Sequence, residues 1–170
     1  MQALCRKEKH ENCDLMDIEI HSMQSLKQRA CKLFAPGTAL INIGELGTAL
    51  PQMEYKPEHI LRLEFDDITP AGIDCEYSGK YAFRLYSVEQ AKQIANFVYR
   101  YRNNCGALLC QCRFGRSSSA AVAAAVKEHF GHNSIEIFAD EQEQYYPNTY
   151  VFRLTLQALQ ERKAEREPLI

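Results

Sequence analysis

Three short apolar runs constrain what this chain can fold into more than any other feature of its sequence. They lie at residues 38–43, 60–65 and 106–112, and each has the length of one buried strand. Between the last two runs, apolar residues at helical spacing follow Ser87 and Gln90, which together form a capping box. Strands separated by helices are typical of a largely parallel sheet that is covered on both faces. We therefore predict a three-layer α/β fold.

The remaining elements follow from local patterns. Alternating residues at 15–21 predict a further strand, and an alanine-rich helix should begin at Ser118 or Ser119. A last helix should follow Pro147 and Asn148. In a parallel sheet, ligands bind beyond the carboxyl ends of the strands, so the loops that follow the strands are the places to look for a site.

The composition fits a single domain. The chain has 170 residues, of which 46% are hydrophobic and 25% charged, and its formal net charge is -2. These values argue against a disordered chain and against a strongly basic surface that binds nucleic acid. We expect residues 1–13 to form a flexible arm, residues 14–160 to form the folded domain, and residues 161–170 to form a charged tail.

Several locations and kinds of site are disfavoured. No apolar run approaches the roughly 20 residues that span a bilayer, and residues 1–13 are too charged for a secretory signal. We therefore expect a cytoplasmic protein with no membrane partner and no nucleic-acid partner. The seven cysteines are odd in number and irregularly spaced, which predicts free thiols. Because there is no Cys-x-x-Cys pair, we expect no zinc site, and nothing indicates another cofactor.

The segment from Cys110 to Ser119 carries the most informative pattern. It places the thiol of Cys112 between a buried strand and the start of a helix. Backbone N–H groups and the positive end of the helix dipole can hold an anion there, and the same field favours the thiolate form of a cysteine. Gly115 would let the backbone turn tightly around that anion. A phosphate held against a thiolate is the arrangement needed for phosphoryl transfer to sulfur, followed by hydrolysis.

Four features of the sequence belong together. They are the strand that ends in Asp66 and Asp67, the helix at 87–98, Cys112 with Gly115 and the run at 119–123, and Pro147 with Asn148. In their order and spacing they resemble the cysteine-dependent protein tyrosine and dual-specificity phosphatases, particularly their compact bacterial relatives. The resemblance covers about residues 38–160.

The resemblance implies a role for each residue of the loop. Cys112 would be the nucleophile, and Ser119 would supply the hydroxyl that steadies its thiolate. Asp66 or Asp67 would be the general acid, because the leaving oxygen must receive a proton as its bond to phosphorus breaks. The implied substrate is a phosphorylated protein or a small phosphoester. The implied phosphate cradle consists of the backbone amides of Arg113, Phe114, Gly115, Arg116, Ser117 and Ser118.

The loop departs from the family pattern at two positions. The family has an arginine six residues after its cysteine, where this chain has Ser118, and a histidine just before it, where this chain has Gln111. A guanidinium binds two phosphate oxygens and matches the charge of the transferring group in a way that a hydroxyl cannot. Arg116 would supply part of the missing charge if its side chain folded back. Two functions therefore stay open: a phosphatase, impaired by the missing arginine, and a catalytically inactive pseudophosphatase that binds phosphate or phosphoproteins.

Two further alternatives use the same loop. Cys110 and Arg116 are themselves six residues apart and are followed by Ser117, so Cys110 would attack in a second register. Gly115 is out of place in that register, and we favour Cys112. The run from Cys112 to Ser117 also resembles the persulfide loop of rhodanese-like sulfurtransferases. The acidic pair and the final helix argue against that family.

Overall fold

The structure is a computed structural model that describes residues 16–72, 83–104 and 106–166. Within these residues, four parallel strands form one sheet in the order β1-β4-β2-β3. Because β4 lies between β1 and β2, the loop that follows β4 leaves from the interior of the sheet. The arm expected at residues 1–13 lies outside the described part. The strands are β1 (Asp17–His21), β2 (Ala39–Gly44), β3 (His59–Glu64) and β4 (Ala107–Gln111).

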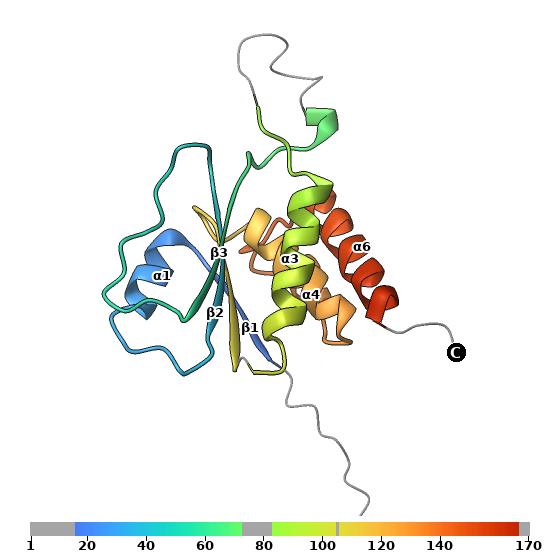
Figure 1. The fold of residues 1–170 in the computed structure, drawn as a ribbon. Coiled ribbons are helices and arrows are strands. Elements are labelled where there is room, and N and C mark those ends of the chain that lie inside the picture. The colour runs from blue at the N-terminus through green and yellow to red at the C-terminus, as the bar shows by residue number, and fades with distance from the viewer. Residues whose placement is uncertain (1–15, 73–82, 105, 167–170) are drawn as a thin grey trace, which may run out of the picture.

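Helices cover both faces of the sheet (Figure 1). Helix α1 (Met23–Arg29) lies on one face, together with the segment that follows β2. The larger helices lie on the other face, and the predicted three-layer α/β fold is confirmed. These helices are α3 (Val88–Tyr101), α4 (Ser118–His129) and α6 (Thr149–Arg166), with the short α5 (Ile135–Phe138) between the last two.

Helix α4 is buried on all sides except in its last turn. Its residues 118–126 are all buried, and it packs against β1, β2 and β4 as well as against α6. A helix that is apolar all round belongs in an interior, and its alanines let the neighbouring backbones approach closely. The start of α4 is therefore fixed directly behind the end of β4.

The two sheet faces have separate cores. The larger core fills the space between the sheet and α3, α4 and α6, and it includes Ile41, Leu63 and Cys110. The smaller core lies under α1 and consists of Leu26, Ala30, Phe34, Leu40 and Leu109. Side chains alternate between the two faces along each strand, which is why Leu109 and Cys110 belong to different cores.

The helix boundaries follow from their caps. The Ser87 hydroxyl accepts from the Gln90 amide at 3.2 Å, and Gln90 Oε1 accepts from the Ser87 amide at 3.0 Å, which confirms the predicted capping box of α3. Asn148 Oδ1 accepts from the amide of Val151 at 3.2 Å and caps α6. Helix α6 continues to Arg166, so it contains the first part of the segment that was expected to be a charged tail. None of the described helices is long and apolar enough to cross a membrane.

Candidate active site

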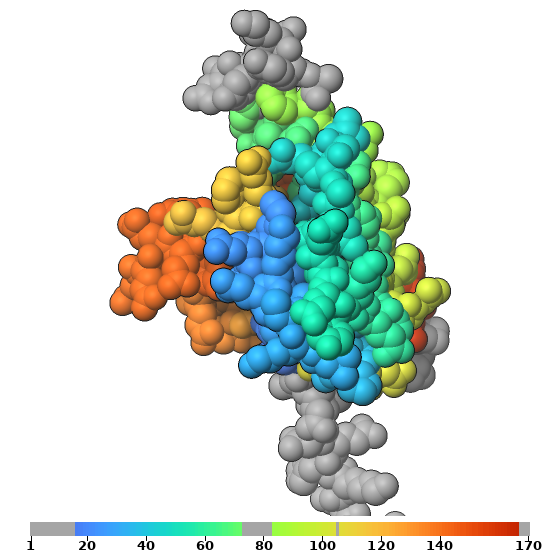
Figure 2. Space-filling view, turned by 90° about the vertical axis from the view of Figure 1, so that its left-hand side faces the viewer, coloured from blue at the N-terminus to red at the C-terminus, as the bar shows by residue number. Residues whose placement is uncertain are grey.

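A cavity of about 740 Å³ lies at the carboxyl edge of the sheet. Its wall is formed by the ends of β2, β3 and β4, the segment after β2, and residues of the loop between β4 and α4. Figure 2 shows a hollow between that segment, drawn in cyan, and the loop, drawn in yellow. The predicted site residues in its wall are Asp67, Cys112, Arg113, Phe114, Arg116, Ser117 and Ser118, whereas Asp66, Cys110, Gly115 and Ser119 are not in it.

Cys112 is the first residue after β4. Its Sγ lies 3.0 Å from the Oγ of Ser119, and the residue is 9% exposed. Its amide donates to the carbonyl of His21 at 3.3 Å, which ties the start of the loop to the end of β1. The structure thus brings together the thiol and the hydroxyl that the sequence resemblance pairs.

Gly115 is the residue at which the loop turns. It has φ +67°, a conformation that favours glycine. A Cβ at this position would lie 2.5 Å from the amide nitrogen of Ser22 and 2.8 Å from the carbonyl carbon of His21. The carbonyl of Arg113 also accepts from the amide of Met23 at 3.1 Å. The loop is therefore packed against the junction between β1 and α1, and only a residue without a side chain fits there.

Ser118, the residue six positions after Cys112, is the first residue of α4. It is 2% exposed, lines the cavity, and its Oγ has no hydrogen-bond partner among the described residues. A buried hydroxyl without a partner carries a free-energy cost that a bound acceptor would relieve. The preceding residue, Ser117, does not cap the helix with its side chain. The first turn of α4 therefore presents a buried donor at the wall of the cavity.

The structure separates the two acidic candidates. Asp67 lines the cavity, and its Oδ1 accepts from Ser117 Oγ and from Asn148 Nδ2, both at 2.9 Å. Asp66 instead accepts from the amide of Arg84 at 2.7 Å and does not line the cavity. Of these two residues, Asp67 is therefore the one that a ligand in the cavity can reach.

The two arginines of the loop point away from its centre. Arg113 pairs with Glu45 at 3.3 Å and lies over the ring of Phe114. Arg116 donates to the carbonyls of Gln144 at 3.0 Å and Glu143 at 2.6 Å. The expectation that Arg116 folds back to supply the missing charge is therefore wrong, because the backbone of the segment before α6 engages its guanidinium.

Cys110 is placed where it cannot act as the attacking thiol. It lies inside β4, is 0% exposed, and pairs with Ile20 of β1 and Ile41 of β2. Burial, with a smaller contribution from the nearby Cys112 thiol, raises the pKa of Cys110 to about 12. The geometry therefore corrects the second register, in which Cys110 attacks and Arg116 and Ser117 follow it.

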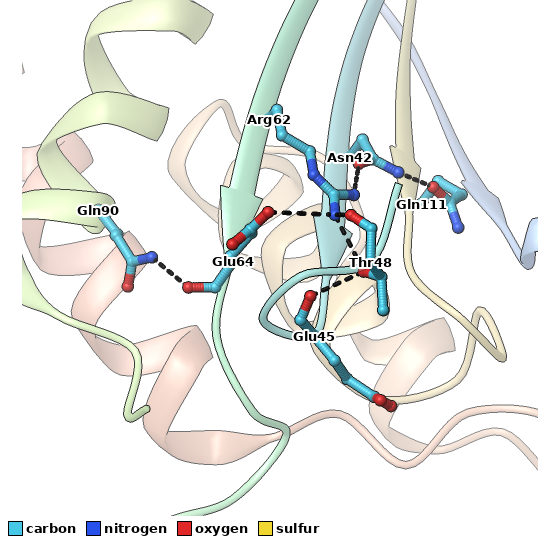
Figure 3. Close-up of polar contacts among 7 residues, drawn as sticks. All are labelled: Asn42, Glu45, Thr48, Arg62, Glu64, Gln90 and Gln111. Atoms are coloured by element: carbon cyan, nitrogen blue, oxygen red, sulfur yellow. Dashed lines mark hydrogen bonds and ion pairs between the residues drawn. The ribbon is translucent and has the colours of Figure 1, made fainter. Parts of the chain in front are cut away.

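The guanidinium of Arg62 lies in the wall of this cavity. No local sequence pattern singles out this residue. The strand register sets it beside Asn42, and Asn42 beside Gln111, so the three side chains lie on one sheet face. Arg62 donates to Asn42, Asn42 donates to Gln111, and Gln111 Nε2 donates to the carbonyl of Cys112 at 2.7 Å. Figure 3 shows the first two of these contacts. A polar chain thus links a guanidinium in the cavity wall to the backbone of Cys112.

The guanidinium of Arg62 is held in place from several sides. It donates to the carbonyl and to the hydroxyl of Thr48, the latter at 3.0 Å, and it lies 3.6 Å from the carboxylate of Glu64 (Figure 3). A Cβ at Gly44 would collide with it, so glycine leaves the necessary room. The sequence signal for this group is the pair of polar residues, Asn42 and Arg62, inside runs that are otherwise largely apolar.

Comparison with known proteins supports the fold. No protein-family model matches the sequence, and no curated protein matches it. The structure is similar to the crystal structure of human DUSP28, a dual-specificity phosphatase, with a TM-score of 0.54 and 15% sequence identity. The similarity covers 87% of this chain and 94% of that chain. At this level of identity, the similarity shows a common fold, and any activity has to be argued from the residues of the site. The chain therefore has the α/β fold of a dual-specificity phosphatase.

Proposed function

We propose that this protein is a cysteine-dependent phosphoester hydrolase that works through a phosphocysteine intermediate and is slowed by the absence of a loop arginine. The position of Cys112 carries the proposal. Its sulfur lies 3.0 Å from the Ser119 hydroxyl, next to the start of α4, and shares one cavity with Asp67. A nucleophile, a hydroxyl that can stabilise its thiolate and a candidate acid are thus together, as covalent phosphoryl transfer requires.

The first step forms a bond between sulfur and phosphorus. Backbone amides of the loop and the hydroxyl of Ser118 would hold the phosphoryl oxygens, with the positive end of the α4 dipole behind them. The thiolate of Cys112 attacks phosphorus as the bond to the leaving oxygen breaks. Asp67 gives its proton to that oxygen. Asn148 and Ser117 hold Oδ1 of Asp67, which orients the carboxyl group.

The second step restores the enzyme. A water molecule attacks phosphorus and gives its proton to Asp67, and the bond between phosphorus and sulfur breaks. Inorganic phosphate leaves, and the hydroxyl of Ser119 donates a hydrogen bond to the thiolate of Cys112 as it re-forms. The two reacting side chains, Cys112 and Asp67, therefore both line the cavity, and Ser119 contacts the sulfur of Cys112.

The rate should be low because no guanidinium reaches into the loop. Arg113 and Arg116 are engaged outside it, and Arg62 lies in the cavity wall with Glu64 3.6 Å away. An arginine that contacts the transferring phosphoryl group is worth roughly 10³-fold or more in related reactions. The dipole of α4 supplies only about half an elementary charge in its place.

The shape of the cavity supports a phosphorylated protein or a small phosphoester as the substrate. Its volume of about 740 Å³ exceeds the needs of a phosphate alone, and the side chains of Phe114 and Tyr146 in its wall are exposed. An aromatic or aliphatic leaving group can pack against these rings while the phosphate lies against the loop.

Mass spectrometry of the acid-quenched protein tests the proposal. After brief incubation with para-nitrophenyl phosphate, the peptide that contains Cys112 should gain the mass of one phosphoryl group. Cys112→Ala should abolish both this adduct and the release of nitrophenol. Cys31→Ser, which changes an exposed thiol, should leave both unchanged. Wild-type turnover in Cys112→Ala would overturn the proposal.

A second candidate is a pseudophosphatase that binds phosphate groups without hydrolysing them. It is favoured by Ser118, whose hydroxyl can contact a phosphate but lacks the charge of an arginine. In that case wild-type protein would bind phosphotyrosine or vanadate, form no phosphocysteine and release no phosphate. The structural similarity to a dual-specificity phosphatase favours both candidates over the sulfurtransferase alternative.

A further inference from the structure

A second cavity lies at the far end of α4 from the site around Cys112. Its volume is about 370 Å³, and residues from the C-terminal ends of α3, α4 and α6 line it. The two cavities are separated by the length of α4, which has 12 residues and is therefore roughly 18 Å long. Figure 1 shows α3, α4 and α6 in one layer on this side of the sheet, with their C-terminal ends directed away from the loop that follows β4.

The lining of this second cavity is strongly positive. Arg102, Lys163 and Arg166 contribute three permanent charges, and His129 contributes a fourth basic group. Within the described part of the chain, no carboxylate lines it. Glu128, which lies next to His129 in sequence, instead accepts a hydrogen bond from Ser134.

The helix dipoles do not balance this charge. Each of the three helix ends carries about half a negative elementary charge, so together they offset about half of the three permanent positive charges. Basic residues in the last turn of a helix are common for this reason, but here an excess of positive charge remains among the described residues after the dipoles are counted. Such an excess in a concave site attracts anions.

The basic groups are held in place by aromatic rings. The guanidinium of Arg102 lies 4.8 Å from the ring centre of Tyr99 and 5.1 Å from that of Phe130. Arg166 lies over the same Tyr99 ring at 5.5 Å. The Nε of Arg102 is buried and has no hydrogen-bond partner among the described residues. Stacked guanidinium groups lose little freedom when they bind, and they match the oxygens of a phosphate.

His129 reports on the charge in the cavity. Its Nε2 lies 2.7 Å from the hydroxyl of Tyr99. Burial lowers the pKa of His129, and the charges of Lys163 and Arg102 lower it further. A bound anion would oppose the effect of these two charges, so the titration of this ring is a sensor of occupancy.

We propose that this cavity binds a small phosphate-bearing anion with at least two negative charges, at a site separate from the one around Cys112. Three permanent charges require more than one negative charge for balance, and the cavity volume leaves room for two linked phosphate groups. Arg102 and Arg166 would contact the phosphate oxygens through their N–H groups, and Lys163 would add a compact charge.

A titration with inorganic pyrophosphate, followed by NMR of the histidine rings, tests this proposal. The ring signals of His129 should shift saturably, and its pKa should rise when pyrophosphate is bound. The backbone amide of Gly115 reports independently on binding at the other cavity. Inorganic phosphate should bind at His129 more weakly than pyrophosphate, because it carries fewer charges.

Matched variants on α6 separate a specific site from general charge. Lys163→Gln and Arg166→Gln should each weaken binding at His129 roughly tenfold, as expected for the loss of one charged contact. Arg153→Gln removes an exposed charge from the same helix away from the cavity and should leave the affinity unchanged. The proposal is overturned if the His129 signals do not move, or if all three variants weaken binding equally.

Discussion

In the proposed mechanism, single side chains decide how fast the loop between β4 and α4 can act. Cys112 contacts Ser119 and shares a cavity with Asp67, and Ser118, six positions after Cys112, lies at the wall of the same cavity. The orphaned hydroxyl of Ser118 can donate one hydrogen bond to a phosphate oxygen, where a guanidinium would donate two and add a charge. We therefore attribute the low rate that we propose to this one residue.

Restoring the arginine tests that assignment. Ser118 lines the cavity and is 2% exposed, so a longer side chain at this position would have to extend toward the cavity. We expect Ser118→Arg to raise kcat for para-nitrophenyl phosphate by roughly 10²-fold or more, because the guanidinium stabilises the transferring phosphoryl group. Ser118→Gln provides a long polar side chain without charge and should give no comparable gain. A rate in Ser118→Arg no higher than wild type would show that another deficiency limits turnover.

The choice between Asp66 and Asp67 shows why sequence alone left part of the site open. The two residues are neighbours with the same side chain, and both follow the same strand. Their roles differ only through partners far along the chain, namely Ser117 and Asn148 for Asp67 and the amide of Arg84 for Asp66. Such long-range contacts leave no local pattern in the sequence.

At the scale of elements, the loop depends on its contact with the junction between β1 and α1. Gly115 has a positive φ and also lies where a side chain would strike the backbone of His21 and Ser22. These two constraints destabilise a substituted protein in different ways. Another residue can adopt the positive φ at a cost in free energy, whereas a collision with backbone atoms forces the loop to move.

A pair of glycine variants separates these constraints. Gly47 has φ +76° but open space around its Cβ position, so Gly47→Ala should cost about 1 kcal/mol of unfolding free energy. Gly115→Ala should cost about 1–3 kcal/mol more, because the collision adds to the strained φ. Denaturant unfolding measures both variants. Equal losses would mean that the loop is not packed against this junction as described.

The elements themselves were largely predictable, because their signals are local. The capping box of Ser87 and Gln90 and the three apolar runs gave α3, β2, β3 and β4 close to their observed positions. The role of Arg62 was not predictable in the same way. It depends on the register that sets Arg62 beside Asn42, and strand register is fixed only when distant segments pair.

Across the whole molecule, the helical layer connects two cavities of different character. One lies at the start of α4 and contains the thiol, and the other lies at the end of α4 and is lined by basic groups. The layered architecture was predictable from the alternation of strands and helices. The second cavity was not, because its basic residues come from three helices that meet only in the folded chain.

The pH dependence of stability tests the lowered pKa of His129. The pKa of His129 lies below its ordinary value of 6.5, mainly through burial and then through Lys163 and Arg102. The unfolded chain therefore binds a proton at this residue more readily than the folded chain does. Stability from this source is complete above about pH 6.5 and is lost as the pH falls toward the lowered value. Unfolding free energies of His129→Gln should fall less steeply over this range than those of wild type; equal slopes would contradict the lowered pKa of His129.

In the proposed mechanism, the loop after β4 holds an oxyanion against the sulfur of Cys112. A crystal structure of the protein soaked with tungstate measures this directly. We expect one tungstate in the cavity, next to the Sγ of Cys112, with its oxygens bound by the loop amides and by the hydroxyl of Ser118. A loop that stays free of tungstate at saturating concentration, with the sulfur of Cys112 turned into the core, would contradict it.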